Sequence, residues 1–218
     1  TLHAWQDEFG DGLHPSAHYS SFGVIYNLDT IGYSSQDNLP IFAVKLSANA
    51  NIEEAQPRVL IIGQCHAEEI YGVEIAMEII NQFVHPEDYS ENRPNLQRGL
   101  AYTEIWVIPT INPEGLRVVY GYLDEDGNEI NDVTYRKNKR DVFNHNGYGY
   151  GTEGVFDFIP GVGQDIDGVD LNRNYDFNWS FGDTLLVPGA SCNAGYDDDY
   201  DYYRGLNPSS ESEIQFIM

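Results

Sequence analysis

The chain has 218 residues, 41% of them hydrophobic, which is enough to bury one sizeable core. Its 35 acidic and 11 basic residues give a formal net charge of -24, and such a surface repels phosphate backbones and argues against nucleic-acid binding. No apolar run approaches the roughly 20 residues that span a bilayer. We therefore expect neither nucleic acid nor a membrane span.

The predicted elements follow the order of an α/β protein. Residues 1–30 carry little periodicity and are expected to form an irregular segment ahead of a domain over residues 31–218. The fully apolar run at 59–62 is typical of a strand buried on both faces of a parallel sheet. Two further strands and one helix, which Pro86 ends, are expected at 39–46, 104–109 and 68–84. This order predicts an α/β fold with a mixed, largely parallel sheet flanked by helices.

The pattern changes in the second half of the chain. From Tyr122 to about Gly168 the sequence is rich in Gly, Asn, Asp and Tyr, with a predicted tight turn at Asp126-Gly127. A loop of this length inside a compact domain usually serves binding or catalysis.

The two ends of the chain suggest a piece of a longer protein. Ser210 is expected to cap a helix, with Glu213 as its capping-box partner, and an apolar helical face follows. The sequence stops at Met218, about two turns into this helix, and it starts at Thr1 rather than Met. We therefore expect truncation at the C-terminus and the removal of a segment ahead of Thr1.

The cysteines and the acidic clusters leave alternatives open. Cys65 and Cys192 are too few for a disulfide scaffold and form either one bridge or free thiols. The run from Asp165 to Asp170 resembles a calcium loop, but its Gly stands at position four rather than six, so we interpret it as a turn. The acidic cluster at 197–201 is interpreted as a solvated loop or a Ca²⁺ site.

A His-x-x-Glu pair follows the second predicted strand. His66 and Glu69 lie where that strand runs into a helix, and α/β proteins place their sites at such strand ends. An imidazole nitrogen and a carboxylate suit Zn²⁺. A His66 that is hydrogen-bonded in the core, with Glu69 at a helix N-terminus, is the competing interpretation.

Several downstream motifs favour the metal interpretation. They are Asn112-Pro113-Glu114-Gly115, Tyr135-Arg136-Lys137-Asn138, Asp170-Leu171-Asn172-Arg173, Tyr203-Arg204-Gly205 and Ser210-Glu211-Ser212-Glu213. In this order and spacing they resemble the zinc metallocarboxypeptidase family (carboxypeptidase A, B and T type, family M14) over residues 31–218. The resemblance implies the phosphorylase/hydrolase-like α/β fold of that family and one Zn²⁺.

The resemblance also implies roles for individual residues. His66 and Glu69 would be the first two zinc ligands, with Asp170 supporting the His66 ring through its second nitrogen. Asn172 and Arg173 would hold the terminal carboxylate of the substrate. Arg136 would polarise the scissile carbonyl while zinc-activated water attacks it.

The sequence departs from the family pattern in three respects. The third zinc ligand, the general-base Glu and the mobile Tyr of the family would all lie beyond the last matching motif. The residue that selects the C-terminal side chain would also lie there. Glu68 stands where many members have an Arg between the zinc His and Glu. We therefore expect weak zinc affinity and no peptidase activity from these residues alone.

The function implied by the resemblance is a secreted or periplasmic zinc exopeptidase that removes C-terminal residues from peptides or proteins. A variant would cleave cell-wall peptides. Two alternatives remain. One is an amidohydrolase of the aspartoacylase type, which shares the His-x-x-Glu pair. The other is a non-catalytic module that binds peptide C-termini, which Glu68 favours.

Overall fold

The computed structural model describes residues 1–12, 14, 16–142, 155–161, 167–177, 179 and 203–218. The chain forms two compact units that alternate along the sequence. The first comprises Thr1–Ile31, Phe42–Gly63 and Tyr71–Thr110, and the second Gly32–Ile41, Gln64–Ile70 and Ile111–Met218. No helix in the described ranges is long and apolar enough to cross a membrane.

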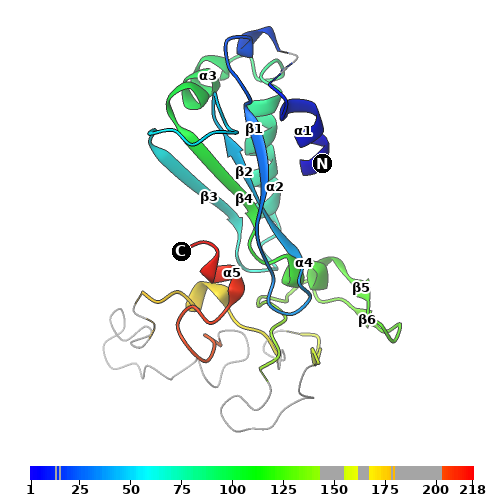
Figure 1. Cartoon of the computed structure of the whole chain (residues 1–218). Helices are drawn as coiled ribbons and strands as arrows, with labels where there is room; N and C mark the ends of the chain where they lie inside the picture. Colours follow the sequence, from blue (N-terminus) through cyan, green and yellow to red (C-terminus); the bar gives the residue numbers. More distant parts are fainter. Residues whose placement is uncertain (13, 15, 143–154, 162–166, 178, 180–202) are drawn as a thin grey trace. The chain divides into compact units, whose positions relative to one another are not determined.

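Four strands form the main sheet, in the order β1-β2-β4-β3 (Figure 1). They are β1 (Tyr26–Tyr33), β2 (Pro40–Leu46), β3 (Arg58–Gln64) and β4 (Glu104–Thr110). Strand β2 pairs antiparallel with β4, and the short connection from β1 to β2 requires an antiparallel pair as well. The α/β class and the mixed sheet are confirmed, but the described pairing is mostly antiparallel, which corrects the expectation of a largely parallel sheet.

Strand β3 is less buried than its apolar sequence suggested. Val59 is 46% exposed and Leu60 50% exposed. The expectation of a strand buried on both faces is therefore wrong for these residues. The physical reason is position, since β3 ends the order of the described strands whereas β2 and β4 lie inside it.

Helix α2 (Tyr71–Val84) supplies the main helical face of the first unit and runs along the sheet in Figure 1. It buries Ala76, Ile80 and Val84, four residues apart, in one apolar core with Val44 and Val107 of the inner strands. The core of this unit is thus formed between the sheet and several helices, with α2 as the longest of them.

The N-terminal segment is more regular than expected. Leu2–Phe9 form helix α1, and Ala17–Tyr19 form the short 3₁₀ helix η1. Helix α3 (Arg93–Tyr102) was also not predicted. Its sequence is mostly polar and has a proline at the start, so it lacks a clear apolar helical pattern. Its buried residues are Leu96 and Leu100.

The second unit consists of short elements joined by loops. They are α4 (Pro113–Tyr120), the strands β5 (Tyr122–Leu123) and β6 (Glu129–Ile130), the 3₁₀ helix η3 (Leu171–Arg173) and α5 (Ser212–Gln215). Strands β5 and β6 pair antiparallel. The predicted turn between them is confirmed, with Gly127 at a φ of 83°, a value that glycine adopts without strain.

Helix α5 begins later than predicted. Its N-cap is Glu211, which makes no side-chain cap bond, so Ser210 is not the cap. The Ser210 hydroxyl instead bonds to Asn174 Nδ2 at 2.9 Å. Glu213 is fully buried and accepts a bond from the Ser35 amide at 3.1 Å rather than closing a capping box. Long-range partners have replaced the local cap.

Candidate metal centre

The His66–Glu69 pair lies in a turn ahead of α2 rather than on the helix. The expected helix start at residue 68 is therefore wrong by three residues, because α2 begins at Tyr71. The Ala67 amide donates to the Arg136 carbonyl at 3.0 Å, and the Glu69 amide to the His66 carbonyl at 3.1 Å. With these amides used elsewhere, the chain passes through a turn that brings both side chains to one side.

The His66 ring has a different carboxylate at each nitrogen. Nδ1 lies 3.1 Å from Glu69 Oε1, and Nε2 lies 3.2 Å from Asp170 Oδ1. The His66 side chain is 9% exposed and that of Glu69 is 59% exposed, whereas Asp170 is fully buried. Nδ1 and the exposed Glu69 carboxylate are groups of the kind that bind zinc as ligands, while the other ring nitrogen faces a buried carboxylate.

Asp170 is held in place by its own loop. Its amide donates to the Tyr203 carbonyl at 2.8 Å, and its Oδ1 accepts from the Asn172 amide at 3.0 Å, at the start of η3. Gly168, at a φ of 96°, lets this loop pass close to the backbone of Asn138, where a Cβ atom would collide. The sequence therefore fixes Asp170 against a ring that is 104 positions away.

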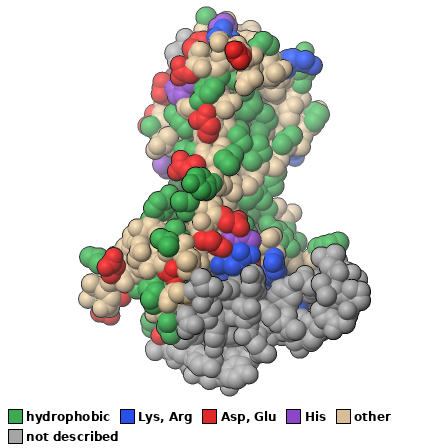
Figure 2. Space-filling view, turned by 180° about the vertical axis from the view of Figure 1, so that it is seen from behind, with side chains coloured by type: hydrophobic (Ala, Val, Ile, Leu, Met, Phe, Trp, Pro, Cys, Tyr) green, Lys and Arg blue, Asp and Glu red, His purple; other side chains and the backbone are tan. Residues whose placement is uncertain are grey.

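Arg136 closes the group of charges. Its Nε donates to Asp170 Oδ2 at 2.9 Å, its Nη1 to Glu68 Oε1 at 3.2 Å, and its Nη2 lies 2.8 Å from His66 Nε2. The side chain is 15% exposed. Figure 2 shows acidic, basic and His side chains gathered together on one face. Arg136 is in reach of the metal pair, but here it is engaged by the protein's own acceptors.

The charges shift the pKa values of the group in opposite directions. Burial alone would lower the pKa of His66, but the hydrogen bond and charge of Asp170 outweigh it and raise that pKa. Burial would raise the pKa of Asp170, and the contacts with His66 and Arg136 lower it instead. Asp170 is therefore a carboxylate at neutral pH and faces His66 Nε2, whereas Nδ1 faces Glu69.

Two buried asparagines hold the loops of the centre together, and the sequence analysis did not single them out. Asn112 caps α4 and donates from Nδ2 to the carbonyls of Cys65 (3.1 Å) and Lys137 (3.0 Å). Asn138 accepts the Val169 amide at 2.8 Å and donates to Glu211 at 2.9 Å. The sequence signal that could have identified them is their position in two of the motifs, at the start of Asn112–Gly115 and at the end of Tyr135–Asn138.

The predicted carboxylate-binding residues follow Asp170 directly on η3. Asn172 is exposed and Arg173 is half-buried, and the Arg173 Nη1 lies 3.4 Å from the Asn172 carbonyl. Both are thus attached to the same turn that carries Asp170. Their role in holding a substrate remains a prediction.

The structure bears in different ways on the hypotheses about the cysteines and the possible calcium sites. Cys65 is a free thiol, and burial raises its pKa to about 12; Cys192 lies outside the described residues. The acidic cluster at 197–201 also lies outside them. Asp167 is buried and accepts the amides of Val142 and Asp157, and Asp165 lies outside the described residues, so the turn interpretation of this run stays a prediction. Within the described ranges no group of three His, Cys, Asp or Glu residues could hold a metal ion, so calcium has no support there.

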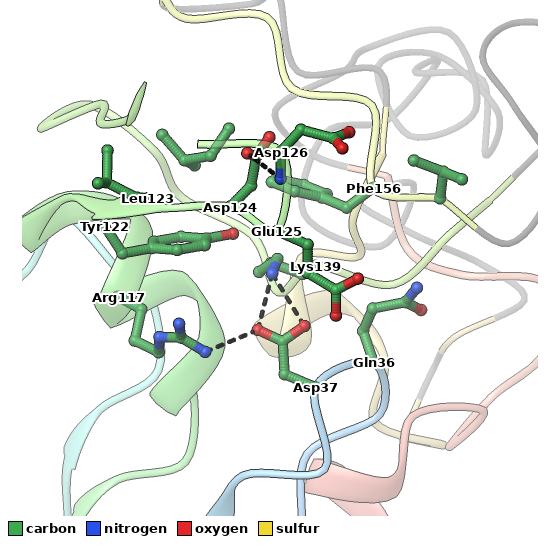
Figure 3. A pocket seen from close by; sticks show the side chains of 12 residues that line it. Gln36, Asp37, Arg117, Tyr122, Leu123, Asp124, Glu125, Asp126, Lys139 and Phe156 are labelled. Atoms are coloured by element: carbon green, nitrogen blue, oxygen red, sulfur yellow. Dashed lines mark hydrogen bonds and ion pairs between the residues drawn. The ribbon is translucent and has the colours of Figure 1, made fainter. Parts of the chain in front are cut away.

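A separate cavity of about 660 Å³ lies in the second unit and is lined by residues of α4 and the β5–β6 hairpin (Figure 3). Asp37 binds Arg117 at 3.2 Å and Lys139 at 2.7 Å on its wall, and both cations lie over the Tyr122 ring. None of the candidate metal residues lines this cavity. The cavity is therefore distinct from the metal centre. Its two cations, Arg117 and Lys139, are paired with Asp37.

Comparison with known proteins agrees with the fold and the motifs. Residues 19–218 match the zinc carboxypeptidase family. A zinc carboxypeptidase of Saccharothrix mutabilis subsp. capreolus is 34% identical over 92 residues, which are 42% of this chain and 20% of that protein. A metallocarboxypeptidase A of Arthroderma otae is 23% identical over 163 residues, 75% of this chain and 29% of that protein. The chain belongs to the zinc carboxypeptidase family.

Solved structures support the same fold. Carboxypeptidase A from Helicoverpa armigera superposes with a TM-score of 0.62 at 19% identity. The match covers 99% of this chain and 39% of the carboxypeptidase chain. Thrombin-activatable fibrinolysis inhibitor gives a TM-score of 0.59 at 18% identity, with 99% and 40% covered. The chain thus spans less than half the length of these relatives, so the activity of the whole protein is a matter for proposal.

Proposed function

We propose that the protein is a zinc-dependent exopeptidase that hydrolyses the C-terminal peptide bond of peptides or proteins, in a secreted or periplasmic setting. The observation that carries this proposal is the His66 ring, with Nδ1 toward the Glu69 carboxylate and Nε2 toward the buried Asp170. A ring that is oriented by a second carboxylate is how proteins prepare a histidine for a catalytic metal.

The described residues include two side chains of the kind that zinc takes as ligands. His66 and Glu69 would be two of its ligands, and a bound zinc ion supplies Lewis acidity and lowers the pKa of water. Asp170, which faces Nε2, would orient the ring with Nδ1 toward the ion. Arg136, whose guanidinium carries five N–H groups, offers donors to a carbonyl oxygen beside the pair. Asn172 and Arg173 orient the substrate through its terminal carboxylate.

The test uses the full-length gene product that contains these 218 residues. We expect release of the C-terminal amino acid from peptides, loss of turnover with a chelator, and recovery on addition of zinc. His66→Ala should abolish turnover, whereas His85→Ala, a histidine at the end of α2 outside the centre, should not. Zinc-independent turnover, or none with any peptide, would contradict the proposal.

A second candidate function is peptide binding without catalysis. Its support is Glu68, whose carboxylate engages Arg136 at 3.2 Å. Binding of peptide C-termini by the zinc-loaded protein without release of amino acids would favour it. Hydrolysis of N-acyl amino acids in place of peptides would favour an amidohydrolase of the aspartoacylase type.

A further inference from the structure

Glu68 is a carboxylate placed between the two candidate metal ligands. It lies in the turn that carries His66 and Glu69, and its side chain is 28% exposed. Its Oε1 accepts from Arg136 Nη1 at 3.2 Å. Arg136 in turn reaches the buried Asp170 through Nε. Glu68 thus lies on the Arg136 side of the centre, where the proposed function puts the scissile carbonyl.

The Glu68 carboxylate is only half satisfied. Its Oε2 is buried and has no hydrogen-bond partner. An ionised carboxylate that loses water without gaining a donor carries a free-energy cost. A cationic group brought to this oxygen would remove that cost, whereas a second anion would increase it.

The balance of charge around the centre points the same way. Asp170 and Glu68 share the guanidinium of Arg136 through different nitrogens. An ion pair with Arg136 therefore does not use up the acceptor capacity of Glu68, because a carboxylate has about four acceptor positions. One oxygen holds Arg136, and the charge of the carboxylate still attracts a cationic ligand group at the exposed part of the side chain.

We propose that Glu68 is a specificity-determining residue that selects substrates with a cationic group just N-terminal to the scissile bond. This inference rests on the proposed function for the position of that bond. The cation is the ammonium or guanidinium of a Lys or Arg side chain, or the free α-ammonium of a dipeptide, which share the same chemistry. Asn172 and Arg173 face the terminal carboxylate instead, so the preference concerns the residue before the cleaved bond.

The competing explanation is that Glu68 only positions Arg136. A residue with that role changes the rate for every peptide by the same factor when it is replaced. A specificity residue changes the ratio between peptides that differ in charge. The ratio of kcat/KM for Lys-containing and Glu-containing peptides therefore separates the two explanations.

The experiment measures kcat/KM of the zinc-loaded, full-length gene product on N-acetylated peptides with Lys, Ala or Glu before the same C-terminal residue. Dipeptides with and without an N-acetyl group test the α-ammonium as the source of the cation. Calorimetry with analogues in which an uncharged ketomethylene group replaces the scissile amide gives binding constants independent of turnover. The variants are Glu68→Gln, Glu68→Arg and, as a control for total charge, Glu74→Gln at an exposed position of α2.

We expect the wild type to prefer Lys over Glu by about tenfold or more, in kcat/KM and in binding. The ratio should fall toward one in Glu68→Gln, invert in Glu68→Arg and stay unchanged in Glu74→Gln. It should also fall with added salt in the wild type, a readout that needs no variant.

The outcomes distinguish this inference from the proposed function. Turnover without a charge preference, or a preference that persists in Glu68→Gln, overturns the inference and leaves the exopeptidase intact. A cation preference in binding without any turnover supports the inference and contradicts the exopeptidase. Absence of both binding and turnover overturns both.

Discussion

At the scale of single residues, the Asp170 carboxylate contacts three groups of the centre. One oxygen faces His66 Nε2 and the Asn172 amide, and the other accepts Arg136 Nε. Because it is fully buried, its charge has no water to replace these donors. The order of the centre therefore depends on this carboxylate more than on the exposed Glu69.

We predict that Asp170→Asn lowers zinc affinity by roughly 10–100-fold. The amide can no longer accept as an anion from the His66 ring, so the tautomer and the basicity of Nδ1 are lost. Competition with a chromogenic chelator measures the dissociation constant. Asp167→Asn, a buried carboxylate in the same loop with only backbone donors, should change the affinity by less than about threefold. Equal losses in both variants would contradict a specific role for Asp170.

Sequence patterns identified local parts of the centre better than its long-range contacts. The spacing of His66 and Glu69 and the Asp170 motif predicted which residues to inspect. The pair between Glu68 and Arg136 spans 68 positions, and no local pattern encodes the approach of two loops that far apart. Asn112 and Asn138 escaped attention because an asparagine in a loop usually signals a turn rather than a buried connection.

At the scale of elements, one buried ion pair connects strands of the first unit. Lys45 of β2 lies 2.8 Å from Glu104 of β4, and Arg58 of β3 lies 2.8 Å from the other oxygen of Glu104. Lys45 and Glu104 are 4% and 1% exposed. Lys45 is itself one of the paired residues of β2 and β4. The ion pairs thus hold the three charged side chains together where β2, β3 and β4 lie side by side.

We predict that Glu104→Gln destabilises the chain by about 3–5 kcal/mol, since it leaves the Lys45 ammonium buried without its counter-ion. The double change Lys45→Met with Glu104→Leu should cost less than the sum of the single changes. Urea unfolding gives the free energies. Glu53→Gln, in the exposed pair with Arg58, should stay within about 0.5 kcal/mol. A near-additive double variant would rule out the coupling.

The same pair predicts the response to acid. Its hydrogen bond with Lys45 outweighs the effect of burial and lowers the pKa of Glu104 from 4.5 to about 2. A carboxylate with a lowered pKa stabilises the fold above its unfolded pKa, and this stability is lost as the pH falls from about 4.5 toward 2. Unfolding free energies measured across this range should fall less in the Lys45→Met and Glu104→Leu double variant than in the wild type. Parallel pH profiles would contradict the assignment.

Glu213 of α5 predicts the opposite pH dependence. Burial, together with the charges of Glu114 and Glu211, raises its pKa from 4.5 to about 7. A raised pKa stabilises the fold below the unfolded value, and that contribution is lost as the pH rises from about 4.5 through 7. Glu213→Gln should reduce this loss by an amount on the order of 1–3 kcal/mol at pH 8, measured by thermal or urea unfolding. A lower stability of the variant at pH 8 would contradict this.

Element prediction succeeded where burial follows local periodicity. The strand at β4 and most of α2 were predicted because their apolar residues face one core. Helices α3 and α4 were missed, since α3 is polar and α4 begins at a proline that also marks a turn. The pairing of β2 with β4 could not be predicted. Strand β3 lies between them in the sequence, and the sequence of neither strand shows that they pair directly in the sheet.

At the scale of the whole molecule, self-repulsion from a net charge of -24 acts against the folded state. We predict that raising NaCl from about 10 to 150 mM, where the screening length falls from roughly 30 to 8 Å, increases the urea midpoint. KCl should act identically. A larger effect of CaCl₂ at matched ionic strength would indicate a bound cation, and a midpoint that falls with salt would show that attractive pairs dominate.

The outer position of β3 has a consequence for how the isolated chain behaves as its concentration changes. Among the strands that the structure describes, β3 is an edge strand, and its exposed Val59 and Leu60 offer apolar side chains to any strand that can align with it. If that strand comes from a second molecule, association and folding are linked by mass action. The apparent stability of these 218 residues would then rise with protein concentration, and an unfolding midpoint would describe a population rather than a single molecule.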